Sequence, residues 1–69
     1  MTDDEKRAAY ERAAEILYKW EYPEFGTDEH SVAVAAIDSL PWVHPGTFNE
    51  DVSELIRDRI AKGDFSWLD

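Results

Sequence analysis

The chain contains no cysteine, and in a chain of only 69 residues this absence strongly constrains the fold. A domain of about 60 residues buries only about 60% of the surface that its unfolded chain exposes, so its core is small. Many small domains add disulfides or cysteine-bound zinc, and neither is possible here. The sequence therefore predicts a single domain, residues 1–69, that is held together by packing alone.

Hydrophobic residues make up 43% of the chain, which is enough for a folded core and argues against disorder. The longest apolar run, Val32 to Ile37, is far too short to cross a membrane. Met1 is followed by charged residues, whereas a signal peptide would continue with an apolar segment. We therefore expect a cytoplasmic protein without a membrane partner.

The charge is strongly negative, with sixteen acidic and seven basic residues and a formal net charge of −9. Nucleic-acid binding depends on lysine and arginine neutralising phosphates, so direct binding to nucleic acid is not expected. A negative field attracts basic surfaces instead, which favours a protein partner that carries such a surface.

Residues 2–20 have the pattern of an amphipathic helix. Thr2 and Glu5 have the spacing of a capping box, and the acidic first turn suits the positive end of the helix dipole. Opposite charges four residues apart predict the ion pairs Arg7–Glu11 and Glu15–Lys19. Apolar residues recur at helical spacing and predict a core-facing stripe, flanked by Tyr10, at Ala9, Ala13, Ile16, Leu17 and Trp20.

A second helix is predicted from a cap at Thr27 or Asp28 to about Leu40, where Pro41 ends it. Residues 32–37 are apolar on all sides, which is typical of a short helix that is buried on most of its faces. A buried strand is the alternative for this run. We favour a helix because alanine disfavours strands and no second strand is evident.

A third helix is predicted after a capping box of Thr47 and Glu50, and Gly63 ends it. Its apolar stripe comprises Phe48, Val52, Leu55, Ile56 and Ile60. The chain is thus expected to be all-α, a small three-helix bundle of up-and-down type with a short C-terminal tail.

No arrangement of residues indicates catalysis, a cofactor or a metal site. His30 and His44 lack a ligand at a spacing typical of metal binding. Ser31 or Ser53 could be combined with His44 and Asp38, but such residues occur in any small protein, and triads are identified by geometry. We therefore expect neither an enzyme nor a protein with a cofactor.

Aromatic residues in the linkers and the tail are the best candidates for binding. Packing is favoured for each one, yet a thin core cannot receive them all, and exposed aromatics anchor protein interfaces. The tail is either an acidic-aromatic docking segment or a latch, and Gly63 favours a latch by turning the chain back. From these segments we select Tyr22, Phe25, Trp67 and Leu68 as candidate binding residues.

The linker segment from Trp42 to His44 is a further candidate, because Pro41 and Pro45 bracket it and reduce its entropy loss on binding. The alternative, slightly favoured, is that Trp42 closes the end of the bundle.

The leading functional hypothesis is a protein-binding regulator, either an inhibitor or an adaptor. A second hypothesis is mimicry of nucleic acid, in which carboxylates of Asp28, Glu29, Glu50, Asp51, Glu54 and Asp58 occupy a basic cleft; Glu50, Glu54 and Asp58 are its candidate site residues. A third is a structural homodimer. In size, acidity and helical character the chain is similar to accessory proteins of phages and mobile elements, a similarity that transfers no residue.

Overall fold

The computed structural model describes residues 1–40 and 48–69, which form three α-helices and one short 3-10 helix. The helices are α1 (Asp3–Tyr18), α2 (Asp28–Ser39) and α3 (Phe48–Lys62), and the 3-10 helix is η1 (Ser66–Leu68). The expected all-α three-helix bundle is confirmed. Four features predicted from the sequence lie outside the described part of the chain, namely Trp42, His44, the Thr47 cap and the side chain of Phe48.

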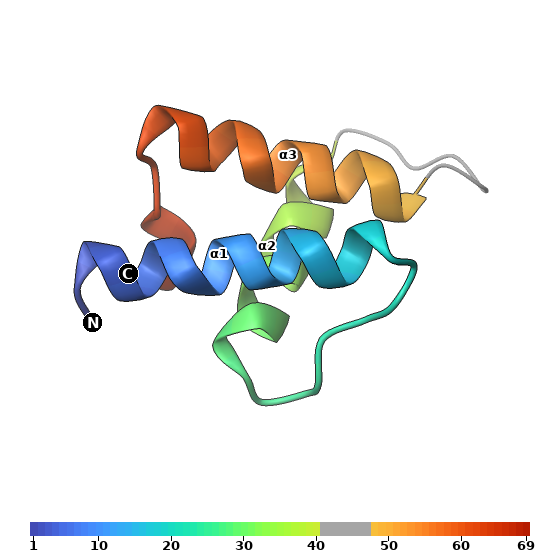
Figure 1. The fold of residues 1–69 in the computed structure, drawn as a ribbon, viewed down its shortest axis with the longest axis horizontal. Helices are drawn as coiled ribbons and strands as arrows, with labels where there is room; N and C mark the ends of the chain where they lie inside the picture. Colours follow the sequence, from blue (N-terminus) through green and yellow to red (C-terminus); the bar gives the residue numbers. More distant parts are fainter. Residues whose placement is uncertain (41–47) are drawn as a thin grey trace.

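The helices pack with α1 and α3 side by side and antiparallel, while α2 crosses behind both at a steep angle (Figure 1). The up-and-down arrangement therefore holds for α1 and α3 but not for α2. The contact between α1 and α3 is the most extensive of the three helix pairs. At its centre the buried hydroxyl of Ser53 donates a 2.7 Å hydrogen bond to the carbonyl oxygen of Ala14.

The core lies where the three helices meet and is made mainly of the predicted stripes. Its largest fully buried apolar side chains are Tyr10, Leu17, Val32, Val52 and Ile56. Residues 32–37 belong to α2, which decides between the helix and the strand that the sequence left open. Not all of this run is buried, however, because Val34 is 38% exposed.

The predicted helix starts within the described ranges are confirmed. At α1, the Glu5 N–H donates to Thr2 Oγ1 (3.2 Å) and the Thr2 N–H donates to Glu5 Oε1 (3.1 Å), which completes the capping box. At α2, Thr27 Oγ1 accepts from the His30 N–H at 3.2 Å. Thr27 is therefore the cap of α2, and Asp28 is its first residue.

The ion pairs within helices are only partly as predicted. Glu15 pairs with Lys19 at 3.1 Å, and Asp58 pairs with Lys62 at 2.9 Å. The predicted pair of Arg7 with Glu11 is absent from the described contacts; the Arg7 guanidinium instead lies 5.6 Å from the centre of the Phe65 ring. None of the helices in the described ranges has the length and apolarity that a membrane span needs.

Residues 64–69 fold back over the bundle and form what we call the C-terminal latch. Gly63 makes the turn with φ = 68°, and Phe65, only 9% exposed, joins the core with its ring 5.1 Å from that of Tyr10. Trp67 stacks on Tyr10 at 5.6 Å, and its backbone N–H donates to the Tyr10 hydroxyl at 3.0 Å. The latch predicted from Gly63 is confirmed.

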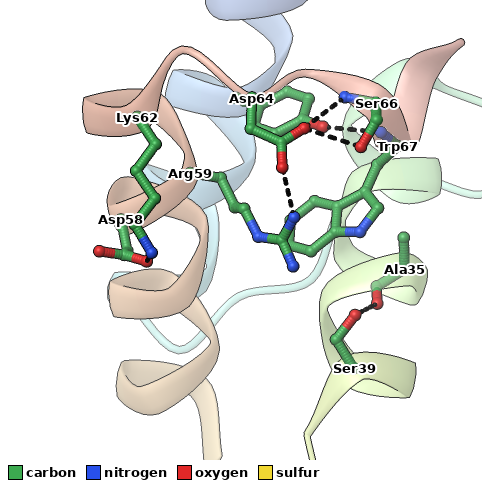
Figure 2. Close-up of polar contacts among 9 residues, drawn as sticks. Ala35, Ser39, Asp58, Arg59, Lys62, Asp64, Ser66 and Trp67 are labelled. Carbon is green, nitrogen blue, oxygen red and sulfur yellow. Dashed lines mark hydrogen bonds and ion pairs between the residues drawn. The ribbon is translucent and has the colours of Figure 1, made fainter.

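The latch is also held by polar contacts around Asp64 (Figure 2). The hydroxyl and the N–H of Ser66 donate to its carboxylate, and the Arg59 guanidinium pairs with it at 2.5 Å. These donors, Ser66 first, hold the pKa of Asp64 below its usual value. Arg59 also lies 4.8 Å from the centre of the Trp67 ring, so one cation joins α3 to two residues of the latch.

Candidate binding surface

The segment that joins α1 to α2 exposes large aromatic side chains. Within eight residues the exposed fractions are 63% for Tyr18, 54% for Trp20, 49% for Tyr22 and 91% for Phe25. The other large aromatics with a described side chain, Tyr10, Phe65 and Trp67, pack in the core or against it. Exposed aromatic side chains are therefore concentrated in this part of the described chain.

The predicted core position of Trp20 is wrong, because α1 ends before it. The Trp20 N–H donates to the Leu17 carbonyl (3.0 Å) and the Glu21 N–H donates to the Ile16 carbonyl (3.1 Å), which is a Schellman motif. Trp20 takes the left-handed position of this motif with φ = 62°. The reversal directs the chain away from the helix before residue 20 could complete the apolar stripe.

The same motif ends α3, where glycine takes the left-handed position. Gly63 donates to the Ile60 carbonyl and Asp64 donates to the Arg59 carbonyl, both at 3.0 Å. Glycine adopts a positive φ without strain, whereas a bulky residue with a Cβ, such as tryptophan, is strained there. Trp20 is the only residue other than glycine with a positive φ in the described chain. Its indole N–H donates to Glu50 Oε1 of α3 at 3.4 Å.

Tyr22 and Phe25 both contact His30, and we call these three residues the loop cluster. The ring of His30 lies 5.6 Å from that of Tyr22 and 5.1 Å from that of Phe25. His30 is partly buried in the first turn of α2. The two candidate residues selected from the sequence are thus brought together by a histidine that the sequence had not placed in a site.

The backbone beside the loop cluster is fixed by a turn. The hydroxyl and the N–H of Thr27 donate to the carbonyl oxygen of Glu24 at 2.7 and 3.3 Å, and Gly26 has φ = 88°. Thr27 also caps α2 through the His30 N–H. Phe25 therefore lies inside a hydrogen-bonded turn, and its ring is presented to solvent by an ordered backbone.

Two shallow depressions lie beside this segment and share Ile16 and Glu21. The first is also lined by Arg12, Glu15 and Lys19, and we call the second, which includes Tyr22 of the loop cluster, the acidic groove. The acidic groove has apolar walls from Ile16, Tyr22 and Pro23, and the carboxylate side chains that line it are those of Glu21, Glu24 and Glu29. The groove thus combines apolar walls with negative charge.

One carboxylate of the groove is already neutralised by an ion pair. Glu29 is bound by the Arg12 guanidinium, which joins α2 to α1. Burial of the Glu29 carboxyl disfavours its charged form, but hydrogen bonds from its own N–H and from Arg12 outweigh this and hold its pKa below the usual 4.5. In contrast, neither Glu21 nor Glu24 forms an ion pair within the described residues.

Most of the residues that line the acidic groove come from a long region of the sequence without lysine or arginine. From Trp20 to Ile56 the sequence contains no lysine or arginine and eight acids: Glu21, Glu24, Asp28, Glu29, Asp38, Glu50, Asp51 and Glu54. The distribution of charge along the sequence could have indicated this region, whereas total charge alone could not.

The remaining candidate residues lie elsewhere. Trp67 and Leu68 are partly buried in the C-terminal latch. Glu50, Glu54 and Asp58 lie exposed on α3, where Glu50 accepts from Trp20 and Asp58 pairs with Lys62. Asp28 and Glu29 lie in the first turn of α2, so the six acids considered for mimicry are divided between α2 and α3.

Trp20, Glu21 and Glu24 are members of this surface that the sequence interpretation missed. The exposure of Trp20 depends on a backbone conformation that tryptophan rarely adopts, so helical periodicity could not reveal it. In the described ranges, no three histidine, aspartate or glutamate side chains are grouped as metal ligands would be. Comparisons with protein-family models, curated proteins and solved structures find no match to this chain.

Proposed function

We propose that this chain is a non-enzymatic protein-binding regulator, an inhibitor or an adaptor that masks a surface on a larger partner. It binds through the loop cluster and the adjoining acidic groove. The observation that carries this proposal is the 91% exposure of Phe25 within a hydrogen-bonded turn.

Leaving this ring in water has a free-energy cost that a partner can remove. Burying a phenylalanine side chain stabilises a fold by roughly 1.5–3 kcal/mol, which is a large share of the unfolding free energy of a small domain. Phe65 of the same chain is buried in the core, whereas Phe25 remains exposed. Because the turn is ordered before binding, little backbone entropy is lost when Phe25 docks.

The test is capture of a partner from host lysate by the wild-type chain and by the double variant Tyr22→Ser/Phe25→Ser. Tyr22 is 49% and Phe25 91% exposed, so we expect the variant to remain folded, which circular dichroism checks. Val34→Ser is the matched control, because Val34 is an exposed apolar residue of α2 that is not a member of the loop cluster, although it lies only one turn from His30.

A partner that is retained by wild type and by Val34→Ser but lost with the double variant supports the proposal. Equal retention by all three proteins would show that binding uses another surface. If no partner is recovered above background at any salt concentration, the proposal of a protein-binding regulator fails. Sedimentation of the purified chain measures the competing homodimer directly, since only that hypothesis expects a doubled mass without a partner.

A further inference from the structure

We infer that the partner carries a basic segment, and that a lysine or arginine side chain of this segment enters the acidic groove beside Tyr22. This inference rests on the proposed function and specifies the chemistry of the partner.

The lining of the acidic groove is complementary both to the apolar stem and to the charged tip of such a side chain. Lysine and arginine have an apolar stem of several methylene groups and a cationic tip, and the stem packs well on apolar surface. Ile16 and Pro23 provide this surface, and Tyr22 adds an aromatic ring, which attracts cations through its face. The carboxylates of Glu21 and Glu24 line the same depression and can receive the tip.

These two carboxylates are available and their backbone is already ordered. Glu29 is engaged by Arg12, and Lys19, which lines the adjoining depression together with Glu21, is paired with Glu15. The N–H of Glu21 is fixed by the Schellman motif, and the carbonyl of Glu24 accepts both donors of Thr27. A cation entering the groove therefore meets negative charge without displacing an ion pair.

Charge complementarity also decides between possible occupants. A second copy of this chain would bring another net charge of −9 against a region that has no lysine or arginine from Trp20 to Ile56. Nucleic acid would be repelled for the same reason. A segment that alternates basic and apolar residues can place a cationic side chain in the acidic groove and an apolar side chain against Phe25 of the loop cluster.

The experiment is a titration of the ¹⁵N-labelled full chain with an acetylated, amidated hexapeptide that alternates lysine and leucine. The control peptide alternates glutamine and leucine. We expect the lysine peptide to shift the amide signals of Glu21, Tyr22, Glu24 and Thr27 saturably. Its affinity should fall when salt is raised from about 0.05 to about 0.3 M, because screening weakens the attraction between exposed charges. The glutamine peptide should produce no saturable shift.

Two double variants distinguish the groove from bulk charge. Glu21→Gln/Glu24→Gln should weaken lysine-peptide binding by roughly 10-fold, since it removes both receiving carboxylates. Asp51→Asn/Glu54→Gln removes the same charge from the exposed face of α3 and should change affinity by less than about 2-fold. Equal losses in the two variants, or amide shifts spread over all acidic positions, would overturn the inference.

The outcome is separable from that of the proposed function. If the partner is lost with Tyr22→Ser/Phe25→Ser but retained with Glu21→Gln/Glu24→Gln, the loop cluster binds a protein and the basic-segment inference is wrong. If the glutamine peptide binds as well as the lysine peptide, the groove recognises apolar groups alone, and the inference is wrong in that case too.

Discussion

At the scale of single residues, Trp20 and Gly63 adopt the same backbone conformation, although one carries an indole and the other has no side chain. Both take the left-handed position at the end of a helix, with φ values of 62° and 68°. A Cβ at Gly63 would meet no atom within 4 Å, so space does not explain the difference. The strain at Trp20 is a property of its backbone, held by the motif that ends α1.

This strain predicts that Trp20→Gly is more stable than Trp20→Ala by about 1 kcal/mol. Both variants lose the indole, but only alanine has a Cβ that makes the positive φ unfavourable. Chemical denaturation of the two variants measures the difference in unfolding free energy. Equal stabilities would show that the left-handed conformation is not maintained once the indole and its hydrogen bond to Glu50 are removed.

The lowered pKa of Glu29 predicts that the stability of the fold depends on pH. Its pKa is lower in the folded chain than the usual 4.5, so its carboxylate stabilises the fold above that pH and loses this effect as pH falls through the folded value. The difference in unfolding free energy between wild type and Glu29→Gln should therefore be largest near neutral pH and shrink below pH 4.5. Denaturation at several pH values measures it. The control Glu24→Gln removes the same charge from a residue without an ion pair in the described chain, and a matching pH response there would contradict this role for Glu29.

At the scale of elements, the C-terminal latch and the segment between α1 and α2 use phenylalanine in opposite ways. Each phenylalanine lies next to a turn that contains a glycine of positive φ. Gly63 returns the chain across α1 and α2, where Phe65 meets Tyr10. The turn at Gly26 instead leads into the cap of α2 and leaves Phe25 in solvent.

Alanine at the two positions should therefore have unequal effects. Phe65→Ala should lower the unfolding free energy by about 3–5 kcal/mol, because it removes a buried ring and leaves a cavity. Phe25→Ala should change it by less than about 0.5 kcal/mol, as is usual for exposed positions. Thermal and chemical denaturation provide both values. A small effect of Phe65→Ala would mean that the latch contributes little to the core.

The helices themselves were largely predictable, because their signals are local. Thr2, Thr27 and Gly63 act within one turn of the chain; Thr2 and Gly63 have the predicted roles, and Thr27 is one of the two caps that the sequence offered for α2. The run at 32–37 was ambiguous, because its apolar residues fit either a buried helix or a buried strand. Its helical state and the exposure of Val34 depend on how α2 crosses the other two helices.

At the scale of the whole molecule, charge repulsion opposes compaction. The net charge of −9 lies on a chain whose Cα radius of gyration is 11.0 Å, which is the size expected of a compact domain of this length. Several ion pairs reduce the repulsion at the ends of the helices, as at Lys62 and Lys6, but the region from Trp20 to Ile56 contains no base.

Sodium chloride should therefore raise the melting temperature by a few degrees, roughly 2–5 °C, by screening this repulsion. Calorimetry over a range of salt concentrations measures the slope. The variant Asp51→Asn/Glu54→Gln carries two fewer negative charges and should give a smaller slope. A flat or falling response in wild type would show that the exposed ion pairs contribute more than the repulsion.

The three helices, the cap of α1, the absence of disulfides and the strong negative charge could all be predicted from the amino-acid sequence. These properties depend on residue identity and on neighbours within a few positions. Which aromatic residues are buried depends on tertiary packing, because Tyr22, Phe25, Phe65 and Trp67 all lie outside the helical stripes and have no local signal that separates them. Their environments are set by the direction in which each turn leaves its helix, and by whether a groove between helices is near enough to receive the ring.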